Sequence, residues 1–99
     1  KANELWSQIL LKDPHNLAAL INLGNLQLSN DNFESARHNY LEALKQDKNT
    51  DPILRNLCIL EYNSGNKLQA KEYFNRMSDK TLLKKANPII YSELLNIGE

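Results

Sequence analysis

The sequence predicts an all-α protein built from antiparallel pairs of helices, and three observations lead to this prediction. Apolar side chains recur every three or four positions through most of the chain, which is the spacing of a helix that is buried along one face. Short clusters of Asn, Ser, Asp and Gly interrupt these stretches, and such residues favour turns. The pattern of residues 17–50 also returns in residues 51–84, which indicates a repeated supersecondary unit.

The first helix pair is expected within residues 17–50. The leucines that mark its first helix are Leu17, Leu20, Leu23 and Leu26. Residues 29–32 read Ser-Asn-Asp-Asn and predict a turn, because their side chains hydrogen-bond local backbone groups. The apolar residues that mark the second helix are Phe33, Ala36, Tyr40, Ala43 and Leu44. Charged residues fall on the opposite side, so this helix is predicted to be amphipathic.

The second helix pair is expected within residues 51–84. Thr50 is suited to cap its first helix, and Pro52 falls in the first turn, where the missing N–H costs no hydrogen bond. The sequence Asn-Ser-Gly-Asn at residues 63–66 predicts a break, and Gly65 is free to adopt a positive φ there. The second helix is expected to begin directly after this break.

The two pairs share both identities and chemical character. Six positions are identical: Leu20 and Leu54, Asn22 and Asn56, Leu23 and Leu57, Leu26 and Leu60, Asn32 and Asn66, Ala36 and Ala70. The first motif is Leu20-x2-Leu23-Gly24 followed by Ala36-x3-Tyr40-x2-Ala43, and its counterpart is Leu54-x2-Leu57-Cys58 followed by Ala70-x3-Phe74-x2-Met77. In this spacing of large, small and aromatic residues the chain resembles the tetratricopeptide repeat (TPR) family.

The chain departs from the family pattern at several positions. Leu20 and Leu54 replace the usual aromatic residue, and Met77 replaces Ala. Lys48 and Leu82 stand where Pro would close a repeat. These substitutions loosen the match without changing its spacing.

Both ends of the chain extend the resemblance. Residues 1–16 match the second helix of a truncated repeat, through Ala2, Trp6, Ile9 and Pro14. Residues 85–99 fit either a further first helix, if three extra residues are allowed before it, or a capping helix. Residues 1–99 are therefore predicted to be a single TPR-like domain.

The resemblance implies a right-handed superhelical stack of antiparallel helix pairs, which is an α-solenoid. One pair cannot bury its apolar face alone, so neighbouring pairs stack. The small residues expected where helices approach closely are Gly24, Ala36 and Ala70. The rings expected to fill the remaining space are those of Trp6, Tyr40 and Phe74.

The composition is that of an ordinary globular chain without charge bias. Twelve basic residues balance twelve acidic ones, so the chain lacks the electropositive field that attracts nucleic acid or anionic membranes. Its apolar runs are far shorter than the roughly 20 residues that span a bilayer. We therefore expect neither a nucleic-acid nor a membrane partner, and no compartment is indicated.

The sequence offers no candidate for catalysis, and neither a cofactor nor a metal ion is expected. His15 and His38 lie far apart in sequence and lack Cys, His or carboxylate neighbours at the spacing of a zinc site. Both are expected on the surface. Cys58 occupies the place of Gly24 in the other repeat and is expected to be a small buried side chain. We therefore predict that the protein is not an enzyme.

The TPR resemblance implies that the first helix of each repeat lines a hollow surface that binds peptides or helices. The residues implied there are Ile21, Asn22, Asn25, Arg55, Asn56, Ile59, Tyr62 and Asn63. Asn22 and Asn56 occupy the same place in successive repeats, and an amide both donates and accepts, so the pair would form a ladder for an extended peptide backbone. The alternative is that both amides cap local polar groups or face water.

Two main functional hypotheses follow, and a third, RNA binding, is disfavoured by the zero net charge. The first is a protein-interaction module that holds a peptide or helical segment of a partner in the hollow surface. The second is a structural module that self-assembles as a weak homo-oligomer through open repeat ends, which carry Trp6, Ile9, Ile90 and Leu94. Family members that grip the carboxylate end of chaperones need cations where this chain has Ile21, Ile89 and Glu93, which disfavours that ligand.

Overall fold

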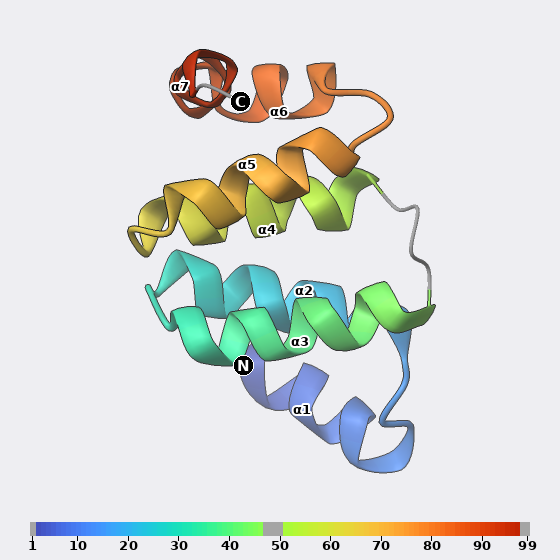
Figure 1. The fold of residues 1–99 in the computed structure, drawn as a ribbon. Helices are drawn as coiled ribbons and strands as arrows, with labels where there is room; N and C mark the ends of the chain where they lie inside the picture. Colours follow the sequence, from blue (N-terminus) through green and yellow to red (C-terminus); the bar gives the residue numbers. More distant parts are fainter. Residues whose placement is uncertain (1, 47–50, 98–99) are drawn as a thin grey trace. The chain divides into compact units, whose positions relative to one another are not determined.

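The computed structural model describes residues 2–46 and 51–97 of the chain, and within these residues it contains seven α-helices and no strand. The predicted all-α class is therefore confirmed. The chain divides into two compact units, unit 1 (Lys1–Lys48) and unit 2 (Asn49–Glu99). Each unit is described separately below, with the helix labels of Figure 1.

Unit 1 contains a helical hairpin and one further helix. Its helices are α1 (Ala2–Lys12), α2 (Leu17–Ser29) and α3 (Phe33–Gln46). Helices α2 and α3 lie side by side, joined by a short turn, and α1 packs against α2 (Figure 1). The predicted helix pair within residues 17–50 thus corresponds to α2 and α3.

Local hydrogen bonds set the ends of α2. Asn16 caps the helix, because its side-chain oxygen accepts a hydrogen bond from the backbone N–H of Ala19 at 2.9 Å. The helix continues through Ser29, one residue into the predicted turn. Asp31 has a φ of 60°, a left-handed conformation in which Asp is several-fold enriched. The turn at residues 30–32 is therefore built by the polar residues that predicted it.

The core of unit 1 lies between α2 and α3. Ala36 and Tyr40 are fully buried, and Gly24 of α2 lies directly against the ring of Tyr40 on α3. A Cβ atom added to Gly24 would lie only 2.7 Å from Cε1 of the Tyr40 ring. The predicted close approach at Gly24 and the predicted core position of the Tyr40 ring are confirmed. Trp6 was also predicted to fill the core, but it is only half-buried because α1 packs chiefly on one helix, α2.

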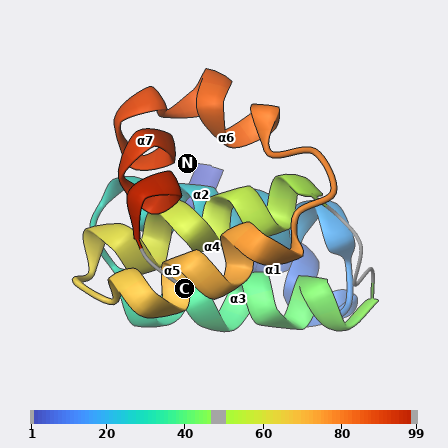
Figure 2. The same ribbon diagram turned by 45° about the horizontal axis from the view of Figure 1, so that its top comes forward.

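Unit 2 contains a second hairpin covered by two shorter helices. Its helices are α4 (Asp51–Asn63), α5 (Lys67–Arg76), α6 (Thr81–Ala86) and α7 (Pro88–Asn96). Helices α6 and α7 pack against each other, while α6 contacts α4 and α7 contacts α5. Figure 1 shows α7 end-on whereas α4 and α5 lie across the view, so α7 runs across the hairpin (Figure 2). The C-terminal segment therefore covers one side of the α4–α5 hairpin.

The start of α4 and the turn that follows it agree with the sequence. Pro52 lies in the first turn of α4, as predicted, whereas the predicted cap Thr50 lies outside the described residues. Gly65 has a φ of +96°, which confirms the predicted positive φ. Helix α5 begins at Lys67, directly after the break at residues 63–66.

Helix α6 is the element that the sequence did not predict. Asp51 at the start of α4 accepts hydrogen bonds from the backbone N–H groups of Ser78 at 3.0 Å and Asp79 at 2.8 Å. Asp79 in turn accepts from the backbone N–H and the hydroxyl of Thr81, and these bonds lower the pKa of the Asp79 carboxyl. Together they turn the chain after α5 and start a new helix.

Helix α7 is anchored through its apolar side. Asn87 caps it by accepting from the backbone N–H of Ile90 at 3.1 Å, and Pro88 occupies the first turn. Ile90 is 3% exposed and Leu94 is 0% exposed. The expectation that these two side chains lie on an open repeat end is therefore wrong, because packing within unit 2 buries both. Ile89 and Leu95 are the exposed apolar residues of α7.

Candidate functional site

The residues predicted to bind a peptide lie on one face of α2 in unit 1 and on one face of α4 in unit 2. In unit 1, Ile21 is half-buried, while Asn22 and Asn25 are exposed. The amide nitrogen of Asn22 donates to the carbonyl oxygen of Ala18 at 2.8 Å, within the same helix. The side-chain oxygen of Asn25 accepts a hydrogen bond from the hydroxyl of Tyr40. One asparagine of this face thus binds its own backbone and the other orients a buried ring.

The α4 face carries Arg55, Ile59, Tyr62 and Asn63, which lie on one side of the helix because they are spaced by three or four residues. Arg55, Ile59 and Tyr62 are half-buried, and Asn63 is exposed. The Nε–H of Arg55 donates to the side-chain oxygen of Asn56 at 3.2 Å. This bond orients the guanidinium group, and no carboxylate among residues 51–97 lies within ion-pair distance of it. Its planar fork is of the kind that recognises carboxylates and carbonyl oxygens.

Asn22 and Asn56 differ in environment although they occupy the same place in the repeat. Asn22 is exposed and hydrogen-bonded to its own helix, whereas Asn56 is 8% exposed and holds Arg55. Each amide therefore already makes a local bond, as the alternative interpretation of the sequence expected. The peptide-binding role of the two residues stays a prediction.

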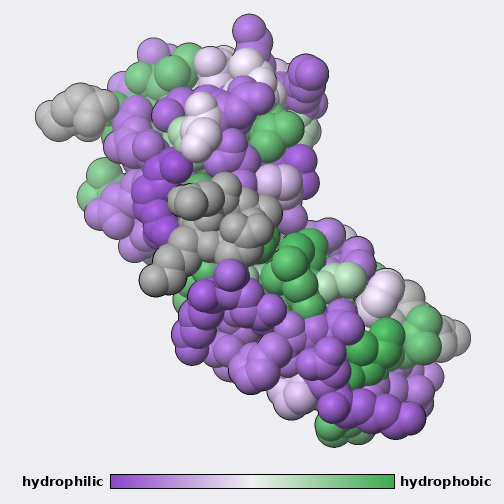
Figure 3. All heavy atoms as spheres, turned by 90° about the vertical axis from the view of Figure 1, so that its right-hand side faces the viewer, coloured by the Kyte–Doolittle hydropathy of each residue, from purple (hydrophilic) through white to green (hydrophobic). Residues whose placement is uncertain are grey.

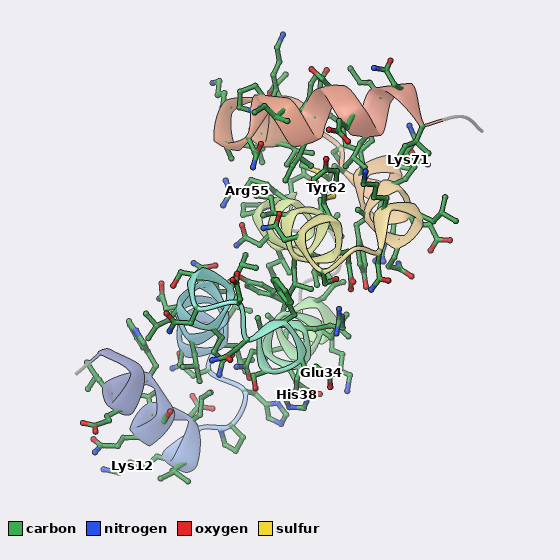
Figure 4. All side chains as sticks on the ribbon, turned by 90° about the vertical axis from the view of Figure 1, so that its left-hand side faces the viewer. Lys12, Glu34, His38, Arg55, Tyr62 and Lys71 are labelled. Atoms are coloured by element: carbon green, nitrogen blue, oxygen red, sulfur yellow. The ribbon has the colours of Figure 1, made fainter. Side chains whose placement is uncertain are left out.

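Tyr62 belongs to a cluster that joins three helices of unit 2. Its hydroxyl donates to the carboxylate of Glu93 on α7, which raises the pKa of Tyr62 and lowers the pKa of Glu93. The ammonium group of Lys67, at the start of α5, lies 3.6 Å from Glu93 and 5.2 Å from the centre of the Tyr62 ring. Figure 4 shows Tyr62 on α4 directed toward α7. The cluster limits the exposure of Tyr62 and places the paired opposite charges of Glu93 and Lys67 at this end of the α4 face.

Glu93 is the member of this region that sequence reasoning missed. It lies 31 positions after Tyr62, on a helix that crosses the hairpin, and no periodic signal connects the two residues. Lys71 was missed for the same reason. Its ammonium group donates to the carbonyl oxygen of Leu94 at 2.7 Å, near the C-terminal end of α7 (Figure 4), where a positive charge is favoured by the helix dipole.

Other chemistry-bearing residues do not gather into a site. Cys58 is buried and donates to the carbonyl oxygen of Ala70 at 3.4 Å, and burial raises the pKa of its thiol to about 12. At neutral pH this thiol is protonated, and a thiol in that form is a poor nucleophile. His38 and Glu34 are exposed on α3 (Figure 4). In the described part of the chain, no three His, Cys, Asp or Glu side chains are placed to hold a metal ion.

The comparisons with known proteins identify no relative. No protein-family model matches the chain, and no curated protein sequence matches it. The resemblance to the TPR family therefore stays a prediction. Among the residues that the structure describes, none of the helices has the length and apolar character needed to cross a membrane.

Proposed function

We propose that the chain is a non-catalytic protein-interaction module in which α2–α3 and α4–α5 are TPR-type repeats. The two hairpins support this proposal because the residue at the same repeat position contacts the second helix in each of them. In the first, Gly24 meets the ring of Tyr40, and in the second, Cys58 at the equivalent place reaches the backbone of Ala70. In a right-handed TPR-type stack, the faces of α2 and α4 would line a concave groove that holds a peptide or helical segment of a partner.

The arrangement of the α4 face is the observation that carries the proposal. Among the described residues, Arg55 hydrogen-bonds to Asn56 through its Nε–H alone, which leaves the terminal NH2 groups of its guanidinium for an acceptor on a ligand. Ile59 and Tyr62 follow about one and two turns later along the helix and are half-buried. A partly exposed apolar strip beside an oriented cation suits a ligand that has both apolar side chains and free backbone carbonyl groups.

The experiment that tests the proposal is selection from a random peptide library displayed on phage, followed by titration of the selected peptides in solution. The parent chain is compared with Arg55→Ala and with Arg76→Ala. Arg76 is a matched control because it is an exposed arginine on α5 of the same unit, outside the α4 face. We expect Arg55→Ala to weaken binding by about tenfold or more, which corresponds to about 1.4 kcal/mol, while Arg76→Ala binds like the parent.

Two further readouts make the result decisive. Chemical shifts of the backbone amides of α4 should change on titration with a selected peptide, and both variants should melt as the parent does. If the library yields no binding peptide, or if Arg55→Ala and Arg76→Ala lose affinity equally, the α4 face is not the binding surface and the proposal is refuted.

A further inference from the structure

Helix α1 of unit 1 carries two leucine side chains that are largely exposed. Leu5 is 54% exposed and Leu11 is 83% exposed, although the helix has only eleven residues. A shallow hollow on its outer side is lined by Leu5, Gln8, Ile9, Leu11 and Lys12. Figure 3 shows green, apolar side chains at the lower end of the view, where α1 lies in Figure 1. In Figure 4, Lys12 on this helix points away from α2 and α3.

On the outer side of α1, the leucines are placed symmetrically about Gln8 and the charged residues on its two sides have opposite sign. Leu5 and Leu11 lie three residues before and after Gln8, and Glu4 and Lys12 lie four residues before and after it. With a rise of about 1.5 Å per residue, each pair is therefore equidistant from Gln8 along the helix axis. If a second copy of α1 lay antiparallel with its Gln8 opposite, each Leu5 would be level with a Leu11. Each Glu4 would then be level with a Lys12 of opposite charge.

Gln8 suits the centre of such a contact. A side-chain amide carries both donors and an acceptor, so two amides related by a two-fold axis satisfy each other with a symmetrical pair of hydrogen bonds. The same patch meets itself in every two-fold interface, which therefore requires a self-complementary surface. The leucines, the amide and the two charges of α1 meet this requirement without any other residue of the chain.

We propose that two copies of the chain associate through the outer side of α1, antiparallel and about a two-fold axis that passes by Gln8. One short helix from each copy buries less surface than a standard protein interface, so the dimer is weak, with a dissociation constant on the order of 0.1 mM. The contact uses no residue of the α4 face. It is therefore independent of the proposed peptide binding, and either proposal can fail without the other.

The first test measures the mass of the parent chain in solution by sedimentation equilibrium, at concentrations below and above the expected dissociation constant. The average mass should rise with concentration toward that of a dimer. Leu11→Glu should weaken this association by at least about tenfold, because it places two carboxylates in the apolar contact. Leu68→Glu is the matched control, since Leu68 is 75% exposed on α5 and its replacement introduces the same charge elsewhere. Circular dichroism confirms that both variants keep their helices.

The second test locates the contact and does not rely on a destabilising charge. In Gln8→Cys the two introduced thiols face each other across the two-fold axis, so oxidised glutathione should convert the chain rapidly into a disulfide-linked dimer. In the control Ser92→Cys the new thiol lies exposed on α7, and cross-linking should be slow. Cys58 does not interfere, because it is buried. A parent chain that stays monomeric at every concentration overturns the proposal, as does equal cross-linking of the two cysteine variants.

Discussion

Replacing Gly24 by Ala tests whether the first hairpin is packed as described. The backbone at Gly24 lies so close to Tyr40 that a Cβ atom would meet Cε1 of the ring at 2.7 Å and Cδ1 at 3.0 Å. The ring has little freedom to move away, because it is fully buried and its hydroxyl is hydrogen-bonded to the side chain of Asn25. The added methyl group must therefore displace either the ring or the helix.

Two opposing effects determine the size of the change. Overpacking a buried contact costs roughly 1 to 3 kcal/mol. Ala is favoured over Gly within a helix by about 1 kcal/mol, which offsets part of this cost. The upper part of the overpacking range applies because the atoms that clash belong to a rigid ring. We therefore expect Gly24→Ala to lower the free energy of unfolding of unit 1 by about 1 to 2 kcal/mol.

Urea denaturation followed by the fluorescence of Trp6 measures this free energy. Trp6 is the only tryptophan of the chain and lies on α1, so its signal reports on unit 1. The control is Ala18→Gly, an exposed position in the same helix, which measures the helix-propensity effect alone. If Gly24→Ala stabilises the protein by as much as Ala18→Gly destabilises it, the ring is not in contact with Gly24 and the described packing of α2 on α3 is wrong.

Two further predictions concern the attachment of α7. Lys71→Met keeps the length of the side chain but removes its charge. It should lower the free energy of unfolding of unit 2 by about 1 to 2 kcal/mol, measured by thermal denaturation. The loss is limited because the backbone N–H of Ile97 still donates to the same carbonyl oxygen of Leu94. Glu93→Gln should flatten the dependence of stability on pH, because the hydrogen bond from Tyr62 holds the pKa of Glu93 below its ordinary value in the folded state. A carboxyl group whose pKa is lowered by folding stabilises the protein at pH values above its unfolded pKa. This stabilisation is lost as the pH falls through the pKa of the folded state. Between about pH 5 and pH 3 the free energy of unfolding should therefore fall more for the parent than for Glu93→Gln. If the melting temperatures of the parent and of Glu93→Gln change equally with pH over that range, the contact between Tyr62 and Glu93 is contradicted.

The attachment of α7 also bears on the proposed binding surface. Tyr62 lies on the α4 face but gives its hydroxyl to Glu93 of α7. A ligand on this face would therefore meet α7 beside Tyr62 and the oriented cation of Arg55 about two turns earlier along α4. The end of the face near Tyr62 carries the Glu93 carboxylate paired with Lys67, and the other end carries the Arg55 guanidinium.

The sequence by itself determined the helices of the two hairpins, the turns between them and several buried residues. These features depend on residues only a few positions apart in the sequence. Examples are the apolar spacing of α2 and α4, the position of Pro52 in the first turn of α4 and the positive φ of Gly65. The tandem pattern also identified Gly24 as a small residue at a close approach of helices and Tyr40 as a ring that fills the core, and the structure brings the two into contact. The residues assigned to the binding faces lie on α2 and α4, on the helices where the TPR resemblance implied them.

Only the tertiary structure decided how the C-terminal segment is used. Helix α6 depends on Asp51 binding the backbone that follows α5, nearly thirty residues further along the chain. The burial of Ile90 and Leu94 and the bond between Tyr62 and Glu93 depend on α7 crossing the α4–α5 hairpin. Periodicity along the chain identifies which side of a helix is apolar. It does not identify which other helix covers that side, because this depends on contacts between residues that are distant in sequence.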